Sequence, residues 1–130
     1  MAAESKSVVR TEAAPAPFQG APYSQAILAN GFVFASGQVG LRAGETELGQ
    51  GIAAQTEQAL ANLRAVLEAA GSGLDRLVKT TVFLQDLGDF AAMNEVYASH
   101  VGSSPPARAT VQVAALPSGA RVEIEAIAAL

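Results

Sequence analysis

The chain has 130 residues, of which 50% are hydrophobic and 15% are charged, and its net charge is −4. This length suits one domain, so we expect residues 1–130 to form a single unit with a frayed end at 1–6. The acidic balance argues against a nucleic acid or an anionic membrane as partner, because both attract clustered Lys and Arg. The chain has no cysteine and one histidine, which excludes disulfides, thiolate nucleophiles and metal sites rich in Cys or His.

The charged fraction is low beside the roughly 25% of typical soluble chains. A small protein has much surface for its volume, so we expect other subunits to cover part of this one. No apolar run reaches membrane-spanning length, and the first residues lack the apolar core of a signal peptide. The expected compartment is therefore the cytoplasm, with no membrane partner.

The first third of the chain predicts three strands. A short strand at 7–10 precedes a loop at 11–22 that is rich in Pro, Gly and Ala. Residues 23–40 contain two extended runs joined at Asn30 and Gly31, and this dipeptide is a strong hairpin signal.

A long helix is predicted after the polar connector at 41–50. Over 52–71 the apolar side chains recur at helical spacing on one face, and Gly71 is placed to end the helix. The same spacing predicts that Asn62 lies away from the apolar face.

The remainder predicts a strand, a second helix and two further strands. Residues 77–84 are β-branched and aromatic, as is typical of strands, and Asp89 is suited to cap a helix over 90–101. The last two strands lie within 105–128. This order predicts an α+β fold, with a mixed β-sheet and two helices packed on one of its faces.

Alternation along the strands predicts which side chains point away from the helices. In the last strand these are Glu123, Glu125 and Ile127, and in the preceding strand they are Arg108, Thr110 and Gln112. In the strand at 77–84, the side chains predicted to point toward the helices are Val78, Val82 and Leu84.

Arg108 and Glu123 allow two interpretations. One hypothesis places them in partly desolvated seams between subunits, where a guanidinium binds an anionic ligand well. The alternative is an ordinary structural pairing of charges across strands.

The segment "PPARATVQVAALPSGARVEIEAIA", residues 105–128, resembles the C-terminal signature of the RidA (YjgF) family. The family's order and spacing also appear in the stretches "APYSQAI", "FASGQVG", "QALANLRAVLEAAG", "VKTTVFLQDLGDF" and "MNEVY". The resemblance therefore covers nearly the whole chain from about residue 15.

The resemblance implies a chorismate-mutase-like fold and a homotrimer whose three sheets form a central barrel, with sites between subunits. It also implies hydrolysis of 2-imino acids, such as 2-iminopropanoate and 2-iminobutanoate, to 2-oxo acids and ammonia. No metal or other cofactor would be needed.

Site residues follow from the same resemblance. Arg108 matches the arginine that holds the substrate carboxylate, and Glu123 matches the carboxylate associated with the attacking water. The substrate-binding positions of the family match Tyr23, Gly37, Asn94 and Thr110. Many family members have cysteine where this chain has Thr110.

Three functions remain open at this point. The first is an imine or enamine deaminase. The second is a non-catalytic trimeric protein that uses the same arginine to bind a small carboxylate or to regulate. The third is the ribonuclease or translation-inhibitor role of some homologues, which the acidic charge disfavours.

Overall fold

One mixed sheet and two helices determine where each candidate side chain can lie. The computed structural model describes residues 5–130, so most of the predicted frayed end at 1–6 lies outside the described residues. In the described part, six strands form one sheet in the order β1-β2-β3-β6-β4-β5. The strands are β1 (Ser7–Val9), β2 (Ala26–Ala29), β3 (Phe32–Val39), β4 (Leu77–Leu84), β5 (Ala107–Gln112) and β6 (Val122–Ala129).

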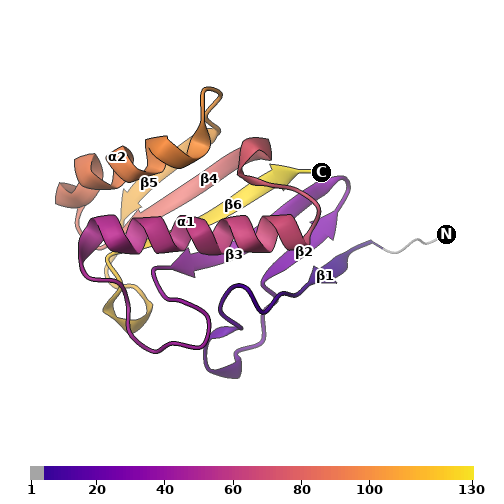
Figure 1. The fold of residues 1–130 in the computed structure, drawn as a ribbon, viewed down its shortest axis with the longest axis horizontal. Coiled ribbons are helices and arrows are strands. Elements are labelled where there is room, and N and C mark those ends of the chain that lie inside the picture. Colours follow the sequence, from indigo (N-terminus) through magenta and orange to yellow (C-terminus); the bar gives the residue numbers. More distant parts are fainter. Residues whose placement is uncertain (1–4) are drawn as a thin grey trace.

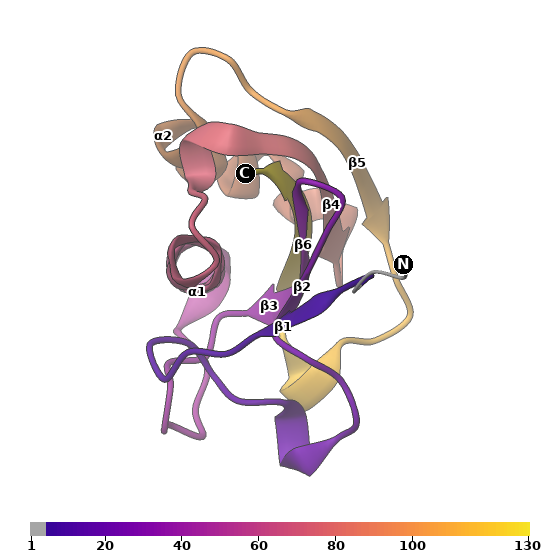
Figure 2. The ribbon, with the colours of Figure 1, turned by 90° about the vertical axis from the view of Figure 1, so that its right-hand side faces the viewer.

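The helices α1 (Gly51–Ala69) and α2 (Phe90–Val101) cover one face of the sheet, as Figures 1 and 2 show. The predicted α+β class with its mixed sheet is therefore confirmed. Figure 2 also shows that the sheet is curved and that its opposite face, here called the open face, carries neither helix. No helix of residues 5–130 is long and apolar enough to cross a membrane.

Local sequence explains the main elements. Asn30 and Gly31 both have positive φ (53° and 82°), as a two-residue hairpin between β2 and β3 requires. Helix α1 buries Leu60, Leu63 and Leu67 completely, each three or four residues from the next along one stripe.

The hydrophobic core fills the space between the helices and the sheet. Val82 and Leu84 of β4 meet Val122 and Ile124 of β6 there, and Met93 of α2 packs against them. Because these strand residues point toward the helices, their sequence neighbours point toward the open face. The predicted orientation of Glu123, Glu125 and Ile127 in β6 agrees with this arrangement.

The predicted orientation of β5 is wrong. Strand β5 does not lie beside β6 but pairs in parallel with β4, with Arg108 opposite Thr80 and Thr110 opposite Val82. Since Thr80 and Val82 are fully buried beneath the helices, Arg108 and Thr110 also point toward the helix side. A crossover through α2 makes the connection parallel, and side-chain alternation alone could not reveal it.

Three smaller expectations are also wrong. Asn62 is buried rather than exposed, because its side-chain amide donates to the carbonyls of Val39 and Leu41. Val78 is exposed, since the β4–β6 register shifts between Leu77 and Lys79.

The third concerns Asp89, which occupies the predicted N-cap position of α2 but whose side chain makes no capping hydrogen bond. It instead forms an ion pair with Arg121, with 3.0 Å between the Asp89 oxygen Oδ1 and the Arg121 nitrogen Nη2. This pairing ties the start of α2 to the turn before β6.

Candidate active site

Arg108 is a half-buried cation held by aromatic rings rather than by a carboxylate. Its guanidinium carbon lies 4.8 Å from the ring centroid of Tyr97 and 5.6 Å from that of Phe90, both on α2. Within residues 5–130 no acidic side chain forms an ion pair with it. Because a ring face attracts a cation without accepting its in-plane hydrogens, the N–H donors of Arg108 stay available for a ligand.

Two polar atoms without partners lie on the same side of the sheet as Arg108. Asn94 Oδ1 and Thr110 Oγ1 are buried, and neither has a hydrogen-bond partner within the described chain. Asn94 is four residues after Phe90 and three before Tyr97, so the three share one face of α2. A buried polar atom without a partner is costly, and in a functional site a ligand can satisfy it.

These side chains are here called the arginine cluster, and it consists of Phe90, Asn94, Tyr97, Arg108 and Thr110. It combines a free guanidinium with two polar oxygens that have no partner in the described chain, the Thr110 hydroxyl and the Asn94 amide oxygen. Such a set is suited to a small anionic molecule with further polar groups.

A second group forms around Glu123 on the open face. Tyr23, Gly37 and Glu123 line a shallow hollow of about 60 Å³, together with Phe18 and Pro117 among others. Ligand pockets usually measure about 300–1,000 Å³, so this hollow is too small to enclose a ligand by itself. We refer to Tyr23, Gly37 and Glu123 as the glutamate cluster.

Gly37 lies against the carboxyl group of Glu123. The β3–β6 register shifts between Ala35 and Gln38, and Gly37 sits inside that irregularity. A Cβ atom at position 37 would come within 2.8 Å of the Glu123 carboxyl carbon, so only glycine leaves this carboxyl group where it is.

The environment of Glu123 raises the pKa of its carboxyl group above the ordinary value of 4.5. Burial is the larger cause, because it penalises the charged form, and the nearby charge of Glu125 adds to it. A carboxylate with a raised pKa is a stronger base, which suits it to accept a proton from water.

Tyr23 is fixed in the loop that closes the hollow. Its hydroxyl oxygen accepts a hydrogen bond of 2.7 Å from the backbone N–H of Phe18. Tyr23 is still 46% exposed, so its ring and hydroxyl hydrogen remain accessible to a ligand.

The two clusters cannot act on one small molecule within one chain. Strand β4 separates Arg108 from Glu123, and their positions differ by three residues along the strands. Strand spacings then put their Cα atoms roughly 14 Å apart, with the side chains on opposite faces of the sheet. The alternative from the sequence was an ordinary pairing of charges across strands, and within residues 5–130 neither Arg108 nor Glu123 forms an ion pair.

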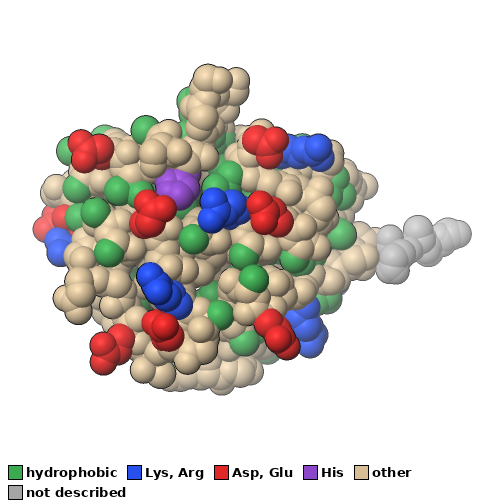
Figure 3. Space-filling view, viewed as in Figure 1, with side chains coloured by type: hydrophobic (Ala, Val, Ile, Leu, Met, Phe, Trp, Pro, Cys, Tyr) green, Lys and Arg blue, Asp and Glu red, His purple; other side chains and the backbone are tan. Residues whose placement is uncertain are grey.

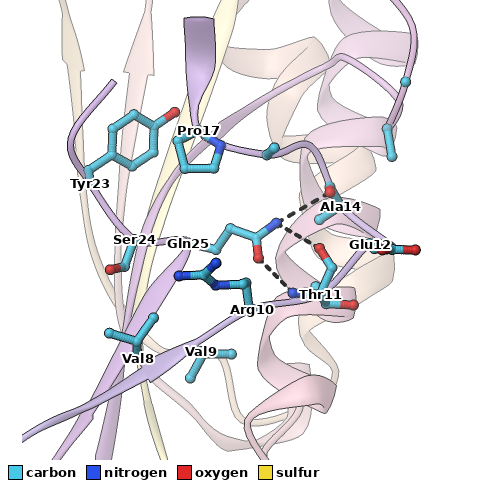
Figure 4. Close-up of a pocket in the computed structure, with 13 residues that line it drawn as sticks. Val8, Val9, Arg10, Thr11, Glu12, Ala14, Pro17, Tyr23, Ser24 and Gln25 are labelled. Carbon is cyan, nitrogen blue, oxygen red and sulfur yellow. Dashed lines mark hydrogen bonds between the residues drawn. The ribbon is translucent and has the colours of Figure 1, made fainter. Parts of the chain in front are cut away.

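A larger hollow of about 630 Å³ lies elsewhere, beside β1 (Figure 4). Tyr23 lines this hollow as well. Gln25 also lines it, but both polar atoms of its side-chain amide already form hydrogen bonds within the chain. Its oxygen accepts from Thr11 N, and its nitrogen donates to carbonyls of residues 11, 14 and 15. These bonds hold the loop that leads to Tyr23, so Gln25 stabilises the wall of the glutamate cluster.

The helix side of the molecule shows charges of both signs scattered over it, with no basic patch (Figure 3). Among residues 5–130 no three His, Cys, Asp or Glu side chains are grouped to hold a metal ion.

Comparison with known proteins identifies the family. The family model described as Endoribonuclease L-PSP matches residues 11–130. A solved structure of RidA from Psychrobacter sp. PAMC 21119 superposes with a TM-score of 0.90 at 45% identity, covering 95% of this chain and 99% of that one. The chain belongs to the RidA family.

Other relatives of this RidA-family chain carry several names. A "RutC family protein" of Pyrococcus horikoshii is 50% identical, with 95% of this chain and 97% of the relative covered. The mouse "2-iminobutanoate/2-iminopropanoate deaminase" is 48% identical, with 95% and 90% covered. The solved structure of Escherichia coli TdcF with bound serine matches with a TM-score of 0.87 at 37% identity, covering 95% and 98%.

Two residues of the RidA arginine cluster, Phe90 and Tyr97, were not predicted from the sequence. The signal that could have found them is their spacing from Asn94, which puts all three on one helix face. Without the position of β5, nothing indicated that this face meets Arg108.

Proposed function

We propose that this protein is a deaminase that hydrolyses 2-imino acids. Water adds to the C=N carbon, the carbinolamine collapses, and a 2-oxo acid and ammonia leave. Relatives at 44–48% identity are named 2-iminobutanoate/2-iminopropanoate deaminase. The substrates proposed here are 2-iminopropanoate, 2-iminobutanoate and their enamine tautomers.

The observation that carries the proposal is the unpaired, half-buried guanidinium of Arg108. A 2-imino acid has a carboxylate beside its C=N bond, and a planar guanidinium can grip a carboxylate with two parallel hydrogen bonds. Asn94 Oδ1 and Thr110 Oγ1 would find partners on the same bound molecule or its water.

Glu123 would supply the proton transfers. As a carboxylate with a raised pKa, it accepts a proton from the attacking water and returns one to the departing nitrogen, so no net proton is consumed. Such general acid–base help is worth on the order of 10²–10⁴-fold. Imines also hydrolyse slowly in water alone, so a site this sparse is sufficient without a cofactor.

The complete site would need a second copy of the chain, since Arg108 and Glu123 cannot meet in one. The open face supports such an assembly, because it presents Phe32, Phe34 and Val111, each about 40% exposed in the single chain. We propose a homotrimer in which the arginine cluster of one subunit faces the glutamate cluster of its neighbour.

A second candidate is a binding protein that holds a small carboxylate without turnover. The TdcF structure with bound serine favours it, because serine carries a carboxylate next to a nitrogen-bearing carbon. The same Arg108 grip would serve both functions, so only a measurement of turnover separates them.

The test couples an amino-acid dehydratase to semicarbazide trapping of the imine that it releases. The proposed deaminase lowers semicarbazone formation in proportion to its concentration, and Arg108→Ala abolishes the effect. If the wild-type protein binds 2-oxobutanoate but leaves semicarbazone formation unchanged, the binding protein is the correct function.

A further inference from the structure

Tyr97 is a buried tyrosine to which the proposed reaction assigns no role. It is only 5% exposed and lies in the middle of α2. Its hydroxyl is 2.6 Å from Thr80 Oγ1, and Thr80 itself is fully buried. Its ring faces the Arg108 guanidinium at 4.8 Å.

The geometry ties three residues into one unit. Thr80 of β4 is the register partner of Arg108 in β5, and Tyr97 reaches across from α2 to bond Thr80. The hydroxyl bond fixes the far end of the ring and so its position, and the ring held there supports the guanidinium. A ring face holds the cation in place and leaves its N–H donors free, whereas a carboxylate would occupy them.

From this arrangement we infer that Tyr97, locked by Thr80, is a positioning residue that sets the orientation of the Arg108 guanidinium for the substrate carboxylate. The inference rests on the proposed function, in which Arg108 is the carboxylate anchor. Phe90 contributes less, since its ring is 42% exposed and its centroid is 5.6 Å away.

The first experiment measures the affinity of the 130-residue chain for 2-oxobutanoate by calorimetry. Tyr97→Leu removes the ring face, and the affinity should fall about 5- to 30-fold, the range expected of a desolvated cation–π contact. Tyr97→Phe keeps the ring and should restore most of that loss. In the imine assay, KM should rise in Tyr97→Leu while kcat changes much less.

Two controls separate positioning from folding. Val66→Ala removes part of a fully buried side chain in α1 and lowers stability, but it should leave the affinity for 2-oxobutanoate unchanged. Thr80→Val keeps the packing and removes only the hydrogen bond to the Tyr97 hydroxyl. The loss of affinity for 2-oxobutanoate should therefore be smaller in Thr80→Val than in Tyr97→Leu. It also provides a test if Tyr97→Leu does not fold.

The second experiment needs no ligand. The Nε–H resonance of Arg108, assigned by its loss in Arg108→Lys, should be shielded by the ring current of Tyr97. In Tyr97→Leu it should move to the range of exposed arginines, and in Val66→Ala it should not move.

The outcomes are distinct. An unshielded Arg108 resonance in the wild-type protein, or an unchanged affinity in folded Tyr97→Leu, overturns the inference and leaves the proposed function standing. A shielded resonance that is lost in Tyr97→Leu supports it. If the wild-type protein shows that resonance but neither binds 2-oxobutanoate nor hydrolyses imines, the proposed function fails and the positioning of the guanidinium holds.

Discussion

Truncating Arg108 to alanine measures how much its guanidinium contributes to ligand binding. Two hydrogen bonds to a carboxylate, each worth about 1.5–3 kcal/mol when charged, set the upper range of the loss. Arg108 is half-buried, so solvent screens part of this. We therefore expect Arg108→Ala to weaken binding by about 2–5 kcal/mol, which is roughly 30- to 4,000-fold.

The assay is calorimetric titration with 2-oxobutanoate, followed by the semicarbazide assay on the same samples. Arg108→Lys should recover little, because an ammonium group cannot make the two parallel bonds. Arg64→Ala is the matched control, since Arg64 is exposed on α1, and it should bind and turn over normally.

The melting temperature of Arg108→Ala shows whether Arg108 binds the ligand or mainly stabilises the fold. Arg108 has no carboxylate partner, so its removal should lower the melting temperature only slightly. Normal turnover in folded Arg108→Ala would rule out Arg108 as the carboxylate anchor, and so would a large loss of stability with ligand affinity unchanged.

Four further predictions concern Glu123, Gly37, Asn62 and the independence of turnover from metal ions. In Glu123→Gln, ligand binding should persist while turnover falls, and the acidic limb of the pH–rate profile should disappear. The pKa of Glu123 is raised on folding, so the contribution of this residue to stability falls as the pH rises above about 4.5. Glu123→Gln should therefore have a higher melting temperature than wild type at neutral pH, and this difference should disappear in acid. Gly37→Ala should fold normally but turn over poorly, as rate and melting curves will show, because its Cβ displaces the Glu123 carboxyl group. Asn62→Leu removes the donor to the carbonyl of Leu41 and one of the two donors to that of Val39, and should cost about 1–3 kcal/mol in urea unfolding at fixed protein concentration. Dialysis against a chelator should leave turnover unchanged, and recovery only with a divalent metal would contradict the mechanism.

Local patterns were enough to predict the elements but not how they pair. The hairpin at Asn30 and Gly31 and the apolar stripe of α1 follow from short-range sequence, and the structure contains both. The partner of β5 depends on a crossover through α2, which is a long-range choice. For that reason the sequence put Arg108 on the wrong face.

Buried amides were missed for a similar physical reason. Gln25, Gln55 and Asn62 look like surface residues by composition, but each one is nearly fully buried. Their partners are backbone groups of loops that only the folded chain brings near: the amide of Gln55 bonds Gly49 O and Arg121 N. Their burial depends on those partners, which helical or strand spacing does not encode.

The candidate site residues were identified by resemblance, and their catalytic roles stay predictions. The structure adds that these residues form two groups on opposite faces of the sheet. Arg108, Asn94 and Thr110 lie on the helix side, whereas Tyr23, Gly37 and Glu123 gather around the hollow at the open face. The sequence could not reveal this division because it depends on the orientation of β5.

A complete site would combine Arg108 of one subunit with Glu123 of another, and mixed oligomers show whether it does. Arg108→Ala and Glu123→Gln, each nearly inactive alone, are unfolded together in equal amounts and refolded. With random assembly, half of the sites have an intact arginine cluster and half have an intact glutamate cluster. About a quarter of the sites therefore have both. Recovery of about a quarter of wild-type turnover is the expected result, and turnover no higher than in the two separate variants would rule out a site shared between subunits.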